Sequence, residues 1–70
     1  MFDESMPFVE KVAYFKRRVN GHTSLQAVQN MRRQYLSGVI ESVDASSLRI
    51  HDLRTGRTVD VLICDIEEAR

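Results

Sequence analysis

The second half of the chain carries the spacing of apolar residues that is typical of short β-strands. These residues fall in three groups, within residues 36–43, 48–50 and 59–66, and in the last two groups apolar and polar residues alternate. Polar turn sequences separate the groups, and the second turn contains Gly56, which can adopt a positive φ. This pattern predicts an antiparallel β-meander.

Residues 6–20, ahead of the meander, have the spacing of an amphipathic helix. Pro7 suits the first turn of a helix, where its missing N–H costs nothing, and Asn20-Gly21 can end the helix with a left-handed residue. The apolar stripe recurs at i, i+4, i+7 and i+11 and consists of Phe8, Val12, Phe15 and Val19.

Residues 24–35 permit two interpretations. Their apolar residues fit a helical stripe that Thr23 or Ser24 would cap, and no clean alternation supports a strand. A helix here would give a two-helix protein with a three-stranded sheet, whereas an extended segment would lengthen the meander. The stripe consists of Leu25, Val28, Met31 and Tyr35.

The chain is short for a domain that is stable by itself. It has 70 residues and one cysteine, so no disulfide can form within it, and His22 and His51 lack the spacing of metal ligands. No cofactor is indicated. Small domains without such crosslinks are commonly stabilised by association, so we expect a single domain over residues 1–70 that assembles with copies of itself.

Charge and hydropathy exclude several classes of protein. The formal net charge is zero, but residues 1–36 hold six bases against three acids (+3), and residues 37–70 hold four bases against seven acids (−3). A strongly basic protein is excluded, and a basic face is not. The chain has no apolar run of about 20 residues, and its N-terminus does not resemble a signal peptide, so we expect a cytoplasmic protein.

Catalytic chemistry is not indicated by any motif. The chain has no Gly-rich phosphate loop, no Ser-His-Asp set and no cluster of metal ligands. Cys64 lies in an apolar run and is expected to be a small buried side chain in a reduced state. Glu67 and Glu68 are adjacent and should point to opposite faces of a strand. We therefore expect a protein that is not an enzyme.

Residues 35–44, followed by residues 48–52, resemble the first signature of the Sm/LSm proteins, which include bacterial Hfq. The resemblance implies a mainly β fold with an N-terminal α-helix, namely a small, strongly bent antiparallel five-stranded Sm-like (SH3-like) barrel. The helix would span about residues 6–20 and the meander about residues 25–69. The matching residues are a strand-bending glycine and the pattern after it: Gly38, Ile40, Ser42, Val43, Asp44, Leu48 and Ile50.

The same resemblance implies assembly into a ring of about five to seven copies. In the family, the fourth and fifth strands pair between neighbouring subunits, and here they correspond to residues 58–64 and 66–69. The family also has a strand before the glycine, which requires part of residues 25–34 to be extended. The expected interface residues are Val59, Val61, Ile63 and Ile66.

The RNA-contacting residues of the family are replaced in this chain. Ser47 or Leu48 stands in place of the loop asparagine of Sm proteins, and residues 62–64 (Leu-Ile-Cys) stand in place of the Tyr-Lys-His run of Hfq. The Arg-Gly of the second signature is also absent. The resemblance thus supports a shared fold and assembly more than a shared RNA site.

RNA, or single-stranded DNA, is the expected partner of such a ring. Phosphates require cations and unpaired bases stack on aromatic rings, and both would be repeated around the axis. Tyr14 is a further possible stacking ring. The candidate residues are Lys16, Arg17, Arg18, Arg32, Arg33, Tyr35, Ser47, Arg49 and His51.

Two alternatives to nucleic-acid binding follow from the same residues. Arg49, Arg54 and Arg57 flank the second turn and are more simply explained by pairing with Asp52 and Asp60 across strands. A chain whose arginines form ion pairs would suit an adaptor of SH3-like barrel form that binds another protein.

Overall fold

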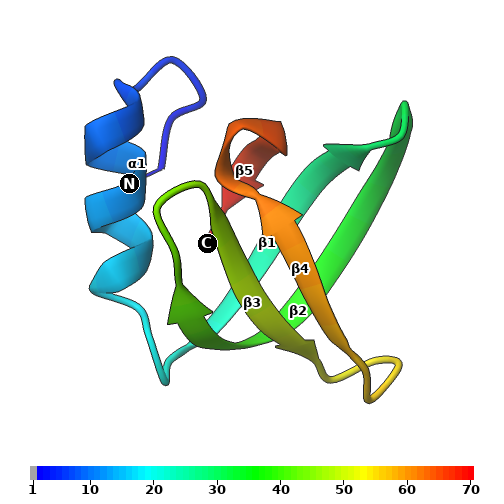
Figure 1. The fold of residues 1–70 in the computed structure, drawn as a ribbon. Coiled ribbons are helices and arrows are strands. Elements are labelled where there is room, and N and C mark those ends of the chain that lie inside the picture. The colour runs from blue at the N-terminus through cyan, green and yellow to red at the C-terminus, as the bar shows by residue number, and fades with distance from the viewer. Residues whose placement is uncertain (1) are drawn as a thin grey trace.

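The computed structural model describes residues 2–70, which form one helix followed by one antiparallel sheet (Figure 1). The predicted N-terminal helix and β-meander are both confirmed. The elements are α1 (Phe8–Lys16), β1 (His22–Gln29), β2 (Arg32–Val43), β3 (Ser47–Asp52), β4 (Thr58–Leu62), a 3₁₀ turn η1 (Ile63–Asp65) and β5 (Ile66–Ala69).

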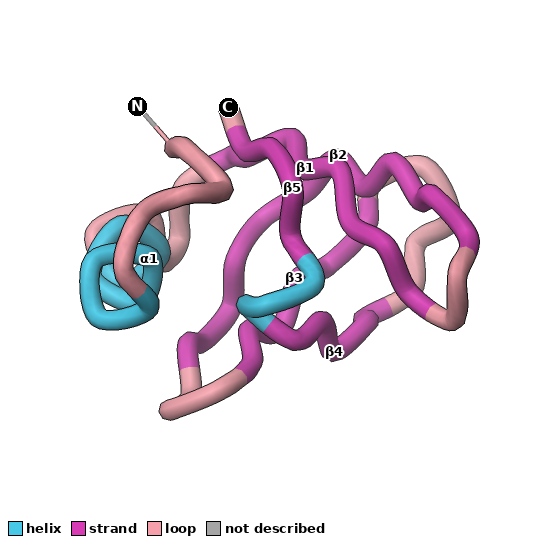
Figure 2. Tube along the Cα trace, turned by 90° about the horizontal axis from the view of Figure 1, so that it is seen from above, coloured by secondary structure: helices cyan, strands magenta, loops and turns pink. Residues whose placement is uncertain are grey.

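The five strands lie in the order β4-β3-β2-β1-β5 and curl around a shared interior (Figure 2). The chain passes from one end of this order to the other through η1. Among the strands of residues 2–70, β4 pairs only with β3, and β5 pairs only with β1. The sheet is therefore open between β4 and β5, where the predicted barrel would be closed.

The helical interpretation of residues 24–35 is wrong, because these residues form most of β1 and the start of β2. β1 pairs with β2 along its whole length and with β5 on its other side. Its core-facing residues are Thr23, Leu25 and Ala27, which follow the period of a strand. Pairing on both sides outweighs the local helical spacing.

Helix α1 is shorter than the predicted range of residues 6–20. Its first turn begins after Pro7, whose carbonyl accepts hydrogen bonds from the N–H groups of Glu10 and Lys11. At the other end the chain tightens into a turn, and Asn20 adopts φ 66°, which confirms a left-handed residue at the Asn-Gly pair. Within residues 2–70, no helix has the length and apolar character needed to cross a membrane.

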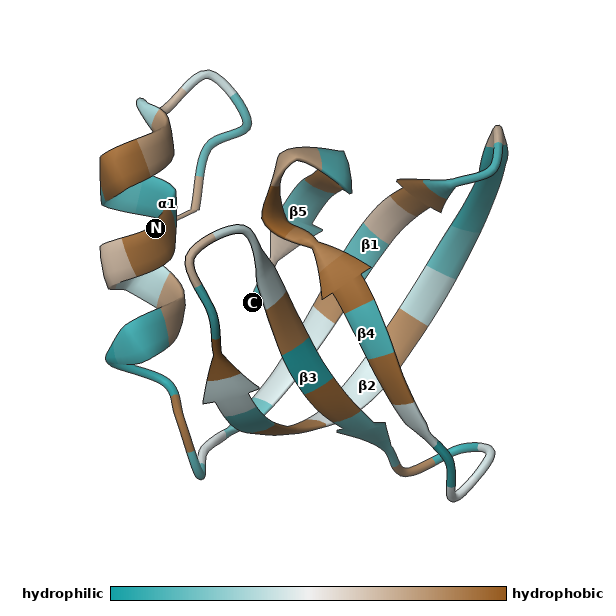
Figure 3. Cartoon of the chain, in the orientation of Figure 1, coloured by the Kyte–Doolittle hydropathy of each residue, from teal (hydrophilic) through white to brown (hydrophobic). Residues whose placement is uncertain are grey.

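The core lies between the concave face of the sheet, α1 and η1. Tyr14 and Phe15 enter it from α1 and contact Phe2, with ring centroids 5.2 to 5.4 Å apart. Along β3 and β4, apolar residues alternate with polar residues, as predicted (Figure 3). The buried apolar residues of the sheet and of η1 are Leu25, Ala27, Leu36, Ile40, Leu48, Ile50, Val61, Ile63, Ile66 and Ala69.

Cys64 is exposed, so the prediction that it is buried is wrong. The alternation of β4 continues into η1, because Val61 is buried and Leu62 is exposed, and the next inward position is Ile63. Ile63 enters the core and Cys64 points outward.

Gly38 lies where β2 crosses close to β3. Its Cα is paired with those of Thr23 on one side and Asp52 on the other. A Cβ at this position would overlap the backbone carbonyl of His51. The position thus requires glycine for close approach of two strands, in a strand that also has a register shift between Ile40 and Ser42.

Candidate functional site

The cations predicted to bind nucleic acid lie in separate places on the molecule. Lys16 and Arg17 are exposed at the C-terminal end of α1, and Arg32 is exposed beside the β1–β2 turn. These two regions lie at opposite ends of the molecule (Figure 1). The five predicted bases therefore do not form one continuous patch on a single chain.

Two of these cations are engaged within the chain. The guanidinium of Arg18 lies over the ring of Tyr14, 3.5 Å from its centroid, and donates a hydrogen bond to the Tyr14 carbonyl. Arg33 is 3.5 Å from the carboxylate of Glu67. Tyr14 is buried in the core, so the prediction that it offers a stacking surface is wrong.

The candidates on β3 contact neighbouring strands. Arg49 donates a hydrogen bond of 3.0 Å to Asp60, which confirms the predicted cross-strand pair and raises the pKa of Arg49. His51 is half-exposed, with Nδ1 3.5 Å from the hydroxyl of Thr58. Ser47 closes the β2–β3 turn, because its carbonyl accepts a hydrogen bond of 2.7 Å from the N–H of Asp44.

The β2–β3 turn and the segment after β4, where the resemblance to the Sm family predicts the RNA contacts, lie side by side. The N–H of Ile63 donates a hydrogen bond of 2.9 Å to the carbonyl of Ser46. The residues that replace the family's RNA-contacting positions are Ser47 or Leu48 and residues 62–64 (Leu-Ile-Cys). None of these positions carries a cation, so they supply no charge attraction for a phosphate.

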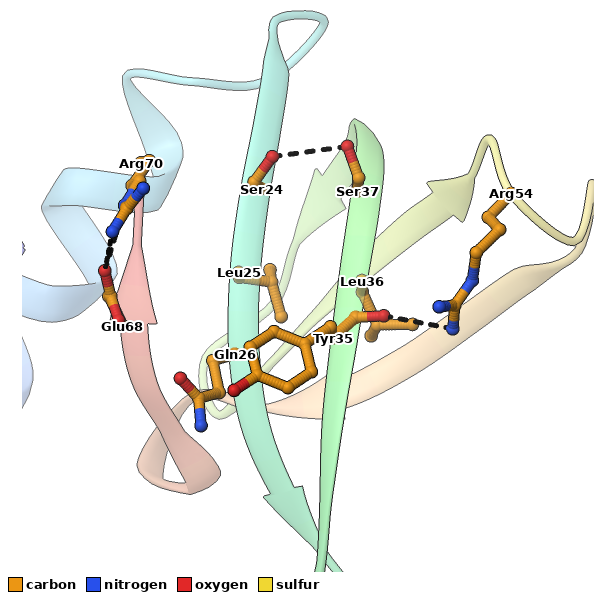
Figure 4. A pocket seen from close by; sticks show the side chains of 9 residues that line it. All are labelled: Ser24, Leu25, Gln26, Tyr35, Leu36, Ser37, Arg54, Glu68 and Arg70. Carbon is orange, nitrogen blue, oxygen red and sulfur yellow. Dashed lines mark hydrogen bonds and ion pairs between the residues drawn. The ribbon is translucent and has the colours of Figure 1, made fainter.

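A separate pocket of about 320 Å³ lies on the outer face of β2, β1 and β5 (Figure 4). The sheet register places outward side chains in two rows that cross the three strands. The first row is Tyr35, Gln26 and Glu68, and the second row is Ser37, Ser24 and Arg70. Arg54, from the loop after β3, borders the pocket beside Tyr35.

Polar contacts hold most of these side chains in place. The hydroxyl oxygens of Ser24 and Ser37 are 3.2 Å apart, and Arg70 donates a hydrogen bond of 2.9 Å to Glu68. Tyr35 is 64% exposed. The pocket therefore combines an open aromatic face with an amide, a carboxylate and two guanidinium groups.

Arg54 is positioned by the loop that follows β3. Its Nη2 donates a hydrogen bond of 3.3 Å to the carbonyl of Tyr35. The Asp52 carboxylate accepts hydrogen bonds of 3.1 Å from the backbone N–H of Arg54 and from the Thr55 hydroxyl. The first of these bonds is the main cause that holds the pKa of Asp52 below its usual value. Asp52 thus pairs with the backbone of Arg54 rather than with its side chain.

Sequence reasoning found Tyr35 and considered Arg54, but it missed Ser24, Gln26 and Arg70. If residues 24–35 are read as two strands, alternate positions place Ser24, Gln26 and Tyr35 on one face. That signal was present in the sequence. The pairing of β1 with β5 was not, because it joins distant segments.

The predicted interface residues lie mainly in the core. Val61, Ile63 and Ile66 are at most 1% exposed, and Val59 is half-buried against them. The outward side chains of β4 are Thr58, Asp60 and Leu62, which are exposed. Any interface at this edge therefore uses the backbone and these outward residues.

Comparisons with protein-family models, curated proteins and solved structures found no match to this chain. Among residues 2–70, no three His, Cys, Asp or Glu side chains are grouped so that they could hold a metal ion.

Proposed function

We propose that this chain is a ring-forming Sm-like protein that binds RNA or single-stranded DNA. The observation that carries the proposal is the strand order, which leaves β4 and β5 as the two edges of one sheet. In the Sm proteins, which residues 35–52 resemble, the fourth and fifth strands are the ones that pair between subunits. Pairing β4 of one copy with β5 of the next would give both edges a partner.

The size and side chains of the protein support assembly. A chain of 70 residues buries a smaller fraction of its surface than a larger domain does, and association adds to that burial. Leu62, which is 48% exposed, lies on the outward face of β4. A neighbouring copy on this edge would cover apolar surface as well as backbone groups.

Nucleic-acid binding is supported by cations that have no ion pair within residues 2–70. Of the cations predicted to bind nucleic acid, Lys16, Arg17 and Arg32 are exposed and form no such pair. On one chain they are too few and too dispersed to make a basic surface. In a ring each would recur with every subunit, and the summed field would attract phosphates although the net charge is zero.

Light scattering and oligonucleotide binding test the two parts of the proposal. We expect a mass that is a multiple of 8.1 kDa, and binding of labelled single-stranded oligonucleotides that weakens as salt increases. Arg17→Glu should lower the affinity about ten-fold or more, whereas Arg57→Glu, the same charge change on the β3–β4 loop, should have a smaller effect.

A monomeric mass together with no binding at low salt would contradict the proposal. An oligomer that does not bind oligonucleotides would favour the adaptor function instead. The intramolecular ion pairs of Arg33 and Arg49 are compatible with such an adaptor.

A further inference from the structure

We infer that the pocket on the outer face of β2, β1 and β5 binds one nucleotide of a single-stranded nucleic acid, with the base against Tyr35 and phosphates at Arg54 and Arg70. The inference rests on the proposed nucleic-acid binding and assigns it a site. That site lies apart from the segments that correspond to the family's RNA pocket.

The stacking surface is the ring of Tyr35. On the core-facing side of this chain, aromatic rings are buried against each other, but Tyr35 points to the outer face and is 64% exposed. Every base has a π-face, so an open aromatic ring on a sheet surface binds unpaired bases with little dependence on sequence. Figure 4 shows this ring beside Gln26 and above the strand pair.

The edge of the base would meet Gln26 and Glu68. Gln26 is the register partner of both Tyr35 and Glu68, so the three side chains form one continuous row. The amide both donates and accepts hydrogen bonds, whereas an ionised carboxylate only accepts them. A base with an exocyclic amino group, such as adenine or cytosine, can donate to Glu68, and uracil has no such group.

The two guanidinium groups lie near opposite ends of this row, Arg70 beside Glu68 and Arg54 beside Tyr35 (Figure 4). Arg54 uses one nitrogen on the Tyr35 carbonyl, and Arg70 contacts Glu68, which leaves further N–H donors on both. Guanidinium groups match the geometry of phosphate oxygens. Arg54 is also held by a loop that Asp52 anchors, so its position is largely set before a ligand binds.

The dimensions and charge of the pocket favour a nucleotide over an acidic peptide. A volume of about 320 Å³ lies at the lower end of the range for small-molecule sites and suits one nucleotide. An acidic side chain could pair with the guanidinium groups, but it has no group that would stack on the Tyr35 ring. A base uses the ring, the amide and the carboxylate together.

The test combines oligonucleotide affinity with binding of single nucleotides. We expect Tyr35→Ala to weaken single-stranded oligonucleotide binding about ten-fold, and Tyr35→Phe to retain most of it. Phe8→Ala is the matched control, because Phe8 is a 46% exposed ring on α1 outside the pocket, and its loss should leave affinity unchanged. Circular dichroism would verify that each variant is folded.

Titration with AMP, CMP and UMP, followed by amide NMR shifts, should perturb the pocket residues and show weaker binding of UMP. Glu68→Gln should reduce this preference, because an amide can also donate to uracil.

Three results would overturn the inference, and they can be told apart. If Tyr35→Ala binds oligonucleotides as tightly as the wild type, the pocket is not the site while the proposed function stands. If the wild type binds no oligonucleotide at low salt, the proposed function fails as well. If an acidic peptide, and not the nucleotides, perturbs the pocket residues, the site belongs to a protein partner.

Discussion

At the residue scale, Asp52 connects the fold with the pocket. It is 1% exposed at the end of β3, and its carboxylate accepts hydrogen bonds from the backbone of Arg54 and the hydroxyl of Thr55. These bonds favour the ionised form and lower the pKa of Asp52. One side chain therefore shapes the loop that presents Arg54.

Asp52→Asn should destabilise the protein at neutral pH and remove part of its acid sensitivity. Because the folded-state pKa is lowered, the ionised carboxylate contributes stability above its unfolded pKa of about 3.9, and this contribution is lost as the pH falls through the folded pKa. We expect the difference in melting temperature between the two proteins to be full at pH 7 and to shrink below about pH 4. If the difference in melting temperature stayed constant across this pH range, the ionisation of Asp52 would not contribute to stability.

At the element scale, Gly38 lets β2 and β3 approach each other. Alanine substitutions at Gly38 and Gly56 distinguish the cost of a steric clash from the cost of a positive φ. Gly38→Ala should lower the free energy of unfolding by about 3 kcal/mol, because the added methyl group overlaps the His51 carbonyl and backbone must shift. Gly56 has φ +73° and open space around it, so Gly56→Ala should cost only about 1 kcal/mol. Urea unfolding measures both. If both variants lost the same free energy of unfolding, β2 and β3 would be able to move apart without a large cost.

The elements also show how far sequence reasoning reaches. β3 and β4 were predictable because each buries one face, so apolar residues alternate along them. β1 was ambiguous, because its core face includes the weakly apolar Thr23 and Ala27. Met31, counted in the helical stripe, is 96% exposed in a turn where it adopts φ 63°.

The pocket was less predictable than the fold. Tyr35 was recognised as a possible stacking ring, but its partners depend on the register of three strands, one of which lies at the far end of the sequence. Gln26 and Glu68 are ordinary surface residues in the sequence. Only the pairing of β1 with β5 places them in one row.

At the scale of the whole molecule, the two sheet edges couple assembly to stability. If subunits join through β4 and β5, unfolding of a chain requires its release from its neighbours, and stability then depends on protein concentration. Raising the concentration about a hundred-fold should raise the melting temperature by roughly 10 °C. A melting temperature that does not change, with a mass of 8.1 kDa, would show that the edges remain unpaired in solution.

The pairing of β1 with β5 also determines how long a newly made β1 must wait for its second partner strand. Leu25 is paired with Ala69, so the ribosome must add 44 further residues (69 − 25) before this partner exists. At about 5 to 20 residues per second this takes roughly 2 to 9 s. Until then β1 has no β5 partner on that side, and an unpaired strand edge is a template for pairing with another chain. Because β1 and β5 are neighbours in the sheet but distant in the sequence, each newly made chain passes through a brief period in which one edge of β1 is open to incorrect pairing.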